Sequence, residues 1–338
     1  MLSVGIIGAS GYTGAELLRL AAGHPEIAVE LATGDSQAGT PIAELYPSLA
    51  GAYGDRRFEA FTPQAVEGLD LVFLGLPHGA SQALVPDLLG RVPHVVDLAA
   101  DFRLADPAAY PTWYGEAHSA PDLLDRFVYG LPELHRRELV GATAVAVPGC
   151  YPTAATLALW PLVQAGLIEK SGIVVDAASG ASGAGRPPKP TTTFCAIDED
   201  FTAYGLLTHR HTPEMEQELG ASVLFTPHLA PMSRGILATC YARPTAAVTT
   251  EQLSELLHAT WDDEPFVVAV GGSPSTKATF GSNAAHVAAH ADPRTGWVVA
   301  LAAIDNLGKG AAGQALQCAN LALGLPEATG LSTVGVYP

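Results

Sequence analysis

The sequence has few basic residues. Its 338 residues include 17 Lys and Arg against 34 Asp and Glu, which gives a formal net charge of -17 at pH 7. Nucleic acids and anionic membranes attract clustered positive charge, so this balance argues against both as partners. It also makes any arginine near a catalytic candidate informative, because few basic groups are available to bind an anionic substrate.

Cysteine is also scarce. The four cysteines form no CxxC pair and match no zinc-ligand spacing, so we expect no metal site. A chain of this length can bury a core without disulfides, and free thiols in a reducing cytosol are expected. Cys195, Cys240 and Cys318 have the pattern of buried, inert cysteines, since Cys240 lies in a strand pattern and Cys318 in a helix pattern.

Long apolar runs are missing too. The start, "MLSVGIIGAS", has neither a basic stretch nor a long apolar one, so no signal peptide is expected. Residues 141–168 carry no charge, but prolines interrupt them, which favours a buried strand, turn and helix over a membrane span. We therefore expect a cytoplasmic protein.

Strands and helices alternate in residues 1–148. The segments "LSVGIIG", "IAVELAT", "LDLVFLGLP" and "HVVDLAA" have strand composition, and helical spacing lies between them. This alternation predicts a parallel, doubly wound sheet, the Rossmann architecture of an α/β protein.

The pattern changes after residue 148. "GIVVDAASG", "ASVLFTPHLAP", "RGILATCYARP" and "GWVVALAAIDN" are predicted strands with long connections, which favour a mixed or antiparallel sheet in an α+β domain over 149–305. "TTEQLSELLHATWDD" predicts a helix capped by Thr249 or Thr250. The last helix, within about 306–338, is expected to join the first domain.

A glycine-rich turn follows the first strand. "GIIGASGYTGAELLRL" places Gly8, Gly11 and Gly14 between a strand and a helix, where glycines allow a tight turn and close approach of a pyrophosphate. A purely structural turn is the alternative. The remaining candidates for cofactor binding in this turn are Ser10, Tyr12 and Thr13.

The end of the second strand, "ATGDSQAG", should meet the adenine ribose of the cofactor. An acid there holds the 2′-hydroxyl of NAD, whereas an arginine accommodates the phosphate of NADP. The segment offers Asp35 and Ser36 and no arginine. Ser36 and nearby N–H groups could hold a phosphate, which Asp35 would oppose if it pointed inward.

Cys150 lies in "PGCYPTA", at a strand-to-helix turn where the helix dipole would lower the pKa of a thiol. A buried, inert cysteine is the alternative. In "THRHTPEMEQEL", His209, Arg210 and His211 precede a helix start, "TPE", and could supply a general base and an anion site. Glu214 fits the first turn of that helix, with orientation of the base as its second role.

These motifs occur in a known order. "LPHG", "ADFRL", "YGLPEL", "PGCYPTA", "SGASGAGR", "HRHTPE", "SRGILAT", "GSNAAH" and "IDNLGKGAAGQA" follow one another along the whole chain. In this the chain resembles the N-acetyl-gamma-glutamyl-phosphate reductase family of arginine biosynthesis and, more distantly, aspartate-semialdehyde dehydrogenases.

The resemblance implies a Rossmann domain for NADP(H), a second domain that carries catalysis and subunit contacts, and a homodimer or homotetramer. It assigns the nucleophile to Cys150 and the base to His209, with His211 as the alternative. The nicotinamide side would be touched by Ser182, Gly183 and Asn306. Two departures are visible: "ATGDSQAG" lacks a basic residue, and "AYGLLTHRH" replaces the usual glycine run before the histidines.

The acyl-phosphate substrate that the resemblance implies carries a phosphate and a carboxylate. On so acidic a chain the candidate anion clamps are Arg103 of "ADFR", then Arg210, then Arg186, each of which could instead be structural.

The expected reaction is NADPH-dependent reductive dephosphorylation of N-acetyl-gamma-glutamyl phosphate through a cysteine thioester. Alternatives are a same-family reductase of an aminoadipyl phosphate in lysine biosynthesis, a non-catalytic NADP-binding regulator, and a redox sensor in which Cys150 is oxidised.

Overall fold

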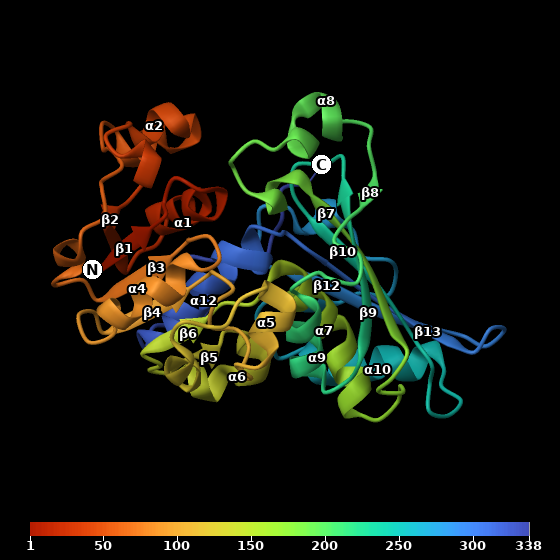
Figure 1. Cartoon of the computed structure of the whole chain (residues 1–338). Helices are drawn as coiled ribbons and strands as arrows, with labels where there is room; N and C mark the ends of the chain where they lie inside the picture. Colours follow the sequence, from red (N-terminus) through yellow and green to blue (C-terminus); the bar gives the residue numbers. More distant parts are fainter. Residues whose placement is uncertain (338) are drawn as a thin grey trace. The chain divides into compact units, whose positions relative to one another are not determined.

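The computed structural model describes residues 1–337, and the chain divides into two compact units (Figure 1). Unit 1 comprises Met1–Pro148 and Ala311–Leu331, and unit 2 comprises Gly149–Gly310 and the residues from Ser332 on. The C-terminal segment of unit 1 is thus shorter at both ends than the predicted 306–338. Residues 332–337 belong to unit 2 again.

Unit 1 contains a six-stranded sheet in which every described pair of strands is parallel. Its order is β2 (Ile27–Ala32), β1 (Leu2–Ile7), β3 (Leu71–Leu74), β4 (His94–Asp97), β6 (Ala144–Ala146) and β5 (Val128–Tyr129). The chain leaves β1 toward β2 on one side and returns to β3 on the other. In open parallel sheets, ligands bind beyond the carboxyl ends of the strands at such a reversal.

Helices provide two apolar cores for this sheet. One core includes residues of α1 (Tyr12–Ala22) and α12 (Gly313–Ala322), which pack on each other, and α6 (Pro132–Leu139) packs on α12. The other includes residues of α4 (Ala80–Leu88) and α5 (Ala109–Tyr114). The two short helices α2 (Ile42–Leu45) and α3 (Ala50–Tyr53) add to the first core. Strands buried on both faces have continuous apolar sequences, which is why the sequence predicted all of them except the two-residue β5.

Unit 2 contains a seven-stranded mixed sheet, which confirms the predicted fold class. Its order is β11 (Val267–Ala269), β12 (Ala285–Asp292), β13 (Trp297–Ile304), β10 (Ile236–Ala242), β7 (Ile173–Gly180), β9 (Val223–Ala230) and β8 (Thr202–Ala203). The β7–β9 and β11–β12 pairs are parallel, and the remaining pairs are antiparallel.

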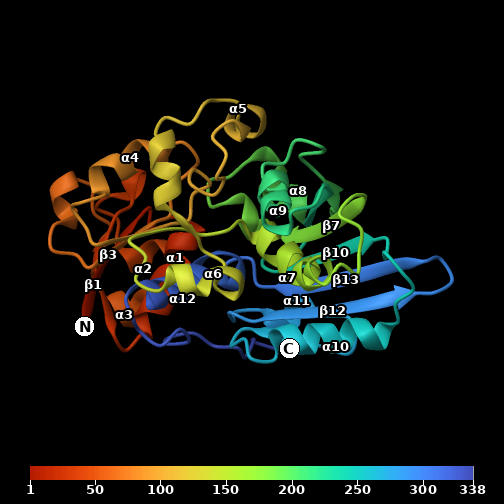
Figure 2. The same cartoon turned by 90° about the horizontal axis from the view of Figure 1, so that it is seen from below.

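The central helix of unit 2 is α7 (Cys150–Gln164), which packs on β10, β12 and β13 (Figure 2). Its residues from Tyr151 to Leu159 are all buried, as expected for a helix that is apolar on every side. Among residues 1–337, no helix combines the length and apolarity that a membrane crossing requires.

The other helices of unit 2 are α8 (Phe194–Ile197), α9 (Thr212–Leu219), α10 (Thr250–Trp261) and α11 (Thr276–Thr279). A π-helical turn, Gly308–Ala312, precedes α12. Thr249 caps α10, because its side-chain oxygen accepts the N–H of Gln252 at 3.3 Å. The N-cap position of α9 is His211, one residue earlier than "TPE" suggested.

The prediction that Cys195 is buried is wrong. Cys195 is exposed because it lies in α8, a four-residue helix with no buried side chain. Cys240 and Cys318 are both buried, as expected.

The packing around Gly14 leaves no space for a side chain. A Cβ at this position of α1 would lie 2.5 Å from both the carbonyl oxygen of Gly8 and the Cα of Ala9. We expect Gly14→Ala to destabilise the protein by about 1–3 kcal/mol, the usual cost of overpacking. The measurement is the thermal unfolding midpoint. Gly51→Ala is the matched control, because Gly51 of α3 has no atom within 4 Å of its added Cβ, and its midpoint should be unchanged or higher. Equal midpoints for the two variants would contradict this reading of the turn.

Candidate active site

Cys150 is the first residue of the buried helix α7. Gly149 occupies the N-cap with extended backbone, and its carbonyl oxygen accepts the N–H of Thr153 at 3.0 Å. The N-terminal N–H groups of α7 and the positive end of its dipole are therefore located around Cys150, and both stabilise a thiolate. Cys150 is partly exposed, so its thiol is held by a rigid element and yet remains accessible.

Glu214 holds the residue before Cys150. Its carboxylate is fully buried in the first turn of α9, and its Oε1 accepts the N–H of Gly149 at 2.5 Å. A buried carboxylate on a backbone N–H makes a strong, charge-assisted hydrogen bond. This bond ties α9, and with it the histidine segment, to the N-terminus of α7.

His211 lies against Gly149. An ideal Cβ on Gly149 would lie 2.5 Å from the Nε2 of His211, so the imidazole occupies the space of the missing side chain. Gly149 has φ of -66°, a backbone conformation that any residue can adopt. A glycine is therefore needed here only because the imidazole of His211 lies so close to its Cα. Of the two candidate bases, His211 is thus the one whose ring contacts the backbone next to Cys150.

His209 is enclosed by aromatic rings. Its ring centroid lies 5.3 Å from that of Phe225, 5.6 Å from that of Tyr204 and 4.7 Å from that of His211. Its Nδ1 accepts the backbone N–H of His211 at 3.2 Å, and the neutral ring therefore carries its hydrogen on Nε2. Burial first, and then the charge of Arg210, lower the pKa of His209 to about 4.

Tyr151 adds a hydroxyl that the sequence did not single out. Its oxygen lies 3.1 Å from the hydroxyl of Tyr204 and 3.1 Å from the carbonyl oxygen of His228. Burial raises the pKa of Tyr151 most, and Tyr204 and the Cys150 thiolate raise it further. The signal in the sequence is its position directly after Cys150, which places it on the same helix turn.

Ser182 and Asn306 are brought together in unit 2. The Nδ2 of Asn306 donates to the Oγ of Ser182 at 2.9 Å, and its Oδ1 accepts the N–H of Gly235 at 2.7 Å. A Cβ on Gly183 would lie 3.8 Å from the Nδ2 of Asn306. The three residues that the resemblance assigns to the nicotinamide side therefore form one polar cluster, in which Asn306 is buried.

The glycine turn of unit 1 is packed closely against the residue that follows β3. Gly8 has φ of +85°, and a Cβ there would lie 2.4 Å from the carbonyl oxygen of Gly75 after β3. The N–H of Gly8 donates to Thr33 Oγ1 at 3.1 Å, and Ser10 Oγ donates to the carbonyl oxygen of Gly34 at 3.1 Å. The carboxyl ends of β1, β2 and β3 are thereby packed around the N-terminus of α1, as a dinucleotide site requires.

Asp35 and Ser36 follow β2 and are both exposed, in a short 3-10 turn. Asp35 has φ of +45°, an uncommon backbone conformation for a residue other than glycine. Their position at the carboxyl end of β2 is the position at which a ribose is recognised.

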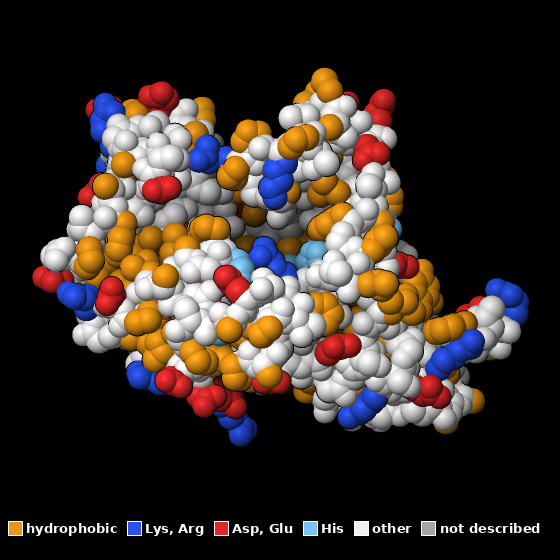
Figure 3. Space-filling model, in the orientation of Figure 1, with side chains coloured by type: hydrophobic (Ala, Val, Ile, Leu, Met, Phe, Trp, Pro, Cys, Tyr) orange, Lys and Arg blue, Asp and Glu red, His pale blue; other side chains and the backbone are white. Residues whose placement is uncertain are grey.

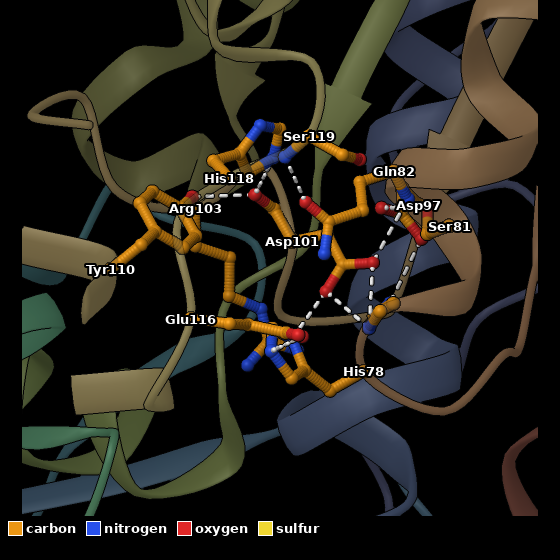
Figure 4. A network of polar contacts seen from close by, with 12 residues as sticks. His78, Ser81, Gln82, Asp97, Asp101, Arg103, Tyr110, Glu116, His118 and Ser119 are labelled. Atoms are coloured by element: carbon orange, nitrogen blue, oxygen red, sulfur yellow. Dashed lines mark hydrogen bonds and ion pairs between the residues drawn. The ribbon is translucent and has the colours of Figure 1, made fainter.

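Arg103 lies in a polar network of unit 1 (Figure 4). Its side chain is nearly buried, and its Nη2 donates to the carbonyl oxygen of Leu98 at 2.8 Å. The neighbouring carboxylate of Asp101 accepts the N–H groups of Gly79 and Gln82, each at 2.9 Å, at the N-terminus of α4.

The rest of this network links the residues around Asp101. The carboxylate of Asp101 pairs with the imidazole of His78, and its carbonyl oxygen accepts the hydroxyl of Tyr110 at 2.5 Å. Asp97, the last residue of β4, accepts the hydroxyl of Ser81, and burial raises the pKa of Asp97 to about 7. The "LPHG" and "ADFR" motifs are therefore parts of one rigid assembly at the carboxyl ends of β3 and β4.

The other arginines differ in their surroundings. Arg186 is partly exposed in the loop after β7, and Arg210 is exposed between the two histidines. Arg234, which the sequence reasoning missed, is largely buried, and its Nε lies 3.0 Å from Asp305 Oδ2. Figure 3 shows Lys and Arg side chains as separate groups on the face drawn. Within residues 1–337, no cluster of His, Cys, Asp or Glu could hold a metal ion.

Family models match both units. Residues 3–142 match "Semialdehyde dehydrogenase, NAD binding domain", and residues 150–306 match "Semialdehyde dehydrogenase, dimerisation domain". Solved structures with the same fold include aspartate semialdehyde dehydrogenase II from Vibrio cholerae, with a TM-score of 0.70, 17% identity, and coverage of 96% of this chain and 98% of that one. The enzyme from Candida albicans, solved with NADP, has a TM-score of 0.69 at 14% identity, with 95% and 98% covered.

The two family models thus define a protein of the semialdehyde dehydrogenase class. N-acetyl-gamma-glutamyl-phosphate reductase from Symbiobacterium thermophilum is 50% identical over all of this chain and 99% of its own length. The protein of that name from Geobacter sulfurreducens is 47% identical over the full length of both. The chain belongs to the N-acetyl-gamma-glutamyl-phosphate reductase family.

The low pKa of His209 predicts a pH dependence of stability. Folded His209 stays neutral down to about pH 4, whereas in the unfolded chain a histidine takes up its proton near pH 6.5. The unfolded state therefore binds more protons in this window, and the free energy of unfolding should fall as the pH falls through it.

His209→Asn removes this contribution. Between about pH 7.5 and pH 5, the parent protein should lose up to about 2 kcal/mol more stability than the variant. Denaturant titrations at both pH values measure the stability that each protein loses. At the higher pH, where the histidine is neutral in both states, the difference between the two proteins gives the effect of the substitution on packing. Parallel losses in the two proteins would show that His209 takes up its proton in the folded state.

Proposed function

We propose that this protein uses NADPH to reduce N-acetyl-gamma-glutamyl phosphate to N-acetylglutamate semialdehyde and releases phosphate, the step of arginine biosynthesis that the motif order implied. The observation that carries the proposal is Cys150 at the N-terminus of a helix buried on all sides, with His211 packed on the preceding residue. The similarity of the whole chain to reductases of that name supports the choice of substrate. We infer that it acts in the cytoplasm, because none of the four cysteines, all of which lie in the described part of the chain, forms a disulfide.

Cys150 is the proposed nucleophile. Its thiolate attacks the acyl carbon, the carbon–oxygen bond to phosphate breaks, and phosphate leaves, so that the acyl group becomes a thioester on Cys150. NADPH, when bound, supplies the hydride that reduces this thioester. The resulting thiohemiacetal collapses to the aldehyde and returns the sulfur of Cys150 as thiolate.

His211 is the proposed acceptor of the thiol proton, and His209 positions it. The sequence favoured His209 for this role, but the ring of His211 is the one against Gly149, and a pKa near 4 makes His209 a weak base. Glu214 holds the N–H of Gly149 and thereby fixes the approach of α9 to Cys150.

NADP(H) is the proposed cofactor in unit 1. The turn of Gly8, Gly11 and Gly14 would hold its pyrophosphate, with Ser10, Tyr12 and Thr13 beside it, and Ser36 would meet the ribose phosphate. In unit 2 the cluster of Ser182, Gly183 and Asn306 would contact the nicotinamide. The proposed anion-binding residues are Arg103, Arg210 and Arg186.

A homodimer or homotetramer is proposed through the open face of the unit 2 sheet. Side chains alternate along β10, where Ala238 and Cys240 are fully buried while Leu237 and Tyr241 remain partly exposed. Val174 of β7 and Leu301 of β13 are likewise partly exposed, and Leu224 of β9 is 49% exposed. An apolar sheet face of this kind favours association, and light scattering gives the number of chains.

Cys150→Ser should abolish reduction of the acyl phosphate and leave NADPH binding unchanged, because the glycine turn belongs to the other unit. NADPH oxidation and fluorescence titration of NADPH are the two measurements. Cys195→Ser is the matched control, since Cys195 is the exposed cysteine of α8, and it should keep full activity. Turnover above a trace in Cys150→Ser would exclude covalent catalysis by this residue.

The two histidines should differ in their effects. We expect His211→Asn to lower kcat about 10²–10⁴-fold, the usual contribution of a general base, and His209→Asn to lower it less. The measurement is kcat for both variants over the same pH range. A larger loss in His209→Asn would return the role of base to His209.

A further inference from the structure

Asp305 is a buried carboxylate that the proposed chemistry does not use. It follows β13 directly and is fully buried. Its Oδ1 accepts the N–H groups of Leu307 at 2.9 Å and Gly308 at 3.1 Å, and its Oδ2 accepts that of Gly281 at 2.6 Å. The Nε of Arg234 lies 3.1 Å from Oδ1 and 3.0 Å from Oδ2.

These contacts join three segments that are distant in the sequence. Arg234 lies between β9 and β10, Gly281 follows α11, and the 307–308 peptides belong to the turn after β13. One carboxylate therefore fixes the ends of two neighbouring strands, β10 and β13, and the turn after α11 relative to one another.

The turn that Asp305 fixes is packed against Cys150. The N–H of Gly310 donates to the carbonyl oxygen of Asp305 at 2.9 Å, and a Cβ on Gly310 would lie 2.8 Å from the Cβ of Cys150. On its other side, a Cβ on Gly308 would lie 2.2 Å from the carbonyl oxygen of Ser282. The turn has no space to move toward either neighbour.

The same contacts reach the polar cluster of Ser182 and Asn306. Asn306 follows Asp305, and its Oδ1 accepts the N–H of Gly235, the residue after Arg234. The N–H of Ser182 donates to the carbonyl oxygen of Ser233 at 3.1 Å. Displacement of Arg234 would therefore move the backbone that holds Asn306 and Ser182.

We propose that Asp305 is a positioning residue, whose carboxylate holds the 305–310 turn against the Cβ of Cys150 and so fixes the direction of the thiol. This inference rests on the proposed function, in which Cys150 is the nucleophile. A misplacement of about 1 Å at a reacting group can cost about 100-fold in rate, so a contact of this kind has a measurable effect on catalysis.

A carboxylate is suited to this place because four N–H groups converge on it. An ionised carboxylate only accepts hydrogen bonds, through two oxygens, whereas an asparagine amide presents one accepting oxygen and one NH₂ that donates. In Asp305→Asn, some of the four N–H groups would face another donor, and Arg234 would lose its counter-charge. The turn should then loosen while the side-chain volume stays the same.

The first test compares Asp305→Asn with Asp292→Asn. Asp292 is the last residue of β12 and pairs with Trp297 at the start of β13, and it also accepts a backbone N–H, that of Arg294 at 3.0 Å, but in an exposed hairpin. We expect kcat to fall about 100-fold in Asp305→Asn, with a smaller change in KM, and to stay unchanged in Asp292→Asn. Circular dichroism and thermal midpoints establish that both variants are folded.

The second measurement needs no substrate. The rate at which iodoacetamide alkylates Cys150 is followed against pH in a Cys195→Ser background, so that the exposed thiol does not contribute. Asp305→Asn should shift or flatten this profile. A role confined to stability would lower the thermal midpoint and leave the alkylation profile as in the parent.

Gly310→Ala tests the same contact while Asp305 stays in place. The added methyl group meets the Cβ of Cys150, so we expect a loss of kcat of similar size and a similar change in alkylation. The effects of the two substitutions should be less than additive in the double variant, because both act through one contact. If Asp305→Asn does not fold, Gly310→Ala still tests whether the contact between the 305–310 turn and Cys150 affects catalysis.

An unchanged alkylation profile in Asp305→Asn, or parent-like kcat in Gly310→Ala, would overturn the proposal. Failure of the proposed function looks different: the parent protein would then not reduce the acyl phosphate, while the alkylation measurements would still report on the position of Cys150.

Discussion

The burial of α7 constrains the chemistry of unit 2. A helix whose residues from Tyr151 to Leu159 are all buried between a sheet and other helices cannot rotate or slide without opening the core. Its first residue, Cys150, is therefore fixed in space, and the helix dipole acts on its thiol permanently. The remaining groups of the site approach this fixed point from α9 and from the turn after β13.

Close packing against glycine is the means by which they approach. His211 occupies the space of an absent Cβ on Gly149, and Cys150 lies where a Cβ on Gly310 would project. Two buried carboxylates hold these contacts in place. The carboxylate of Glu214 accepts the N–H of Gly149, and that of Asp305 accepts the N–H groups of Leu307 and Gly308. Each carboxylate leaves its neighbouring segment little freedom, so the site is organised before any ligand arrives.

Much of the fold could be predicted because local signals and global packing agree. Apolar strands with helices between them identified the parallel sheet, and the pattern "TTEQ" identified the start of α10 to within one residue. By contrast, β12, with the sequence AHVAAHAD, has little strand preference of its own and is held by its neighbours β11 and β13. Cys195 was misjudged because a cysteine without a strong pattern around it says little about its burial.

The residue types of the candidate site could be predicted, and their proposed roles less so. Cys150, His211, Ser182 and Asn306 are recognisable from motifs. The choice between two histidines two residues apart depends on which ring lies against Gly149, and no spacing rule gives that contact. The role of Asp305 could not be predicted from the sequence either, because its hydrogen-bond donors come from segments up to 71 residues away.

A thioester on Cys150, held between two separate steps, is the intermediate of the proposed reaction. It is tested most directly in the reverse direction, by rapid mixing of the enzyme with N-acetylglutamate semialdehyde and NADP while phosphate is titrated from zero. A thioester intermediate predicts at most one NADPH per active site without phosphate, followed by a stall, and sustained turnover once phosphate is present to accept the acyl group. Sustained NADPH formation at zero phosphate would contradict it, because water would then be the acyl acceptor.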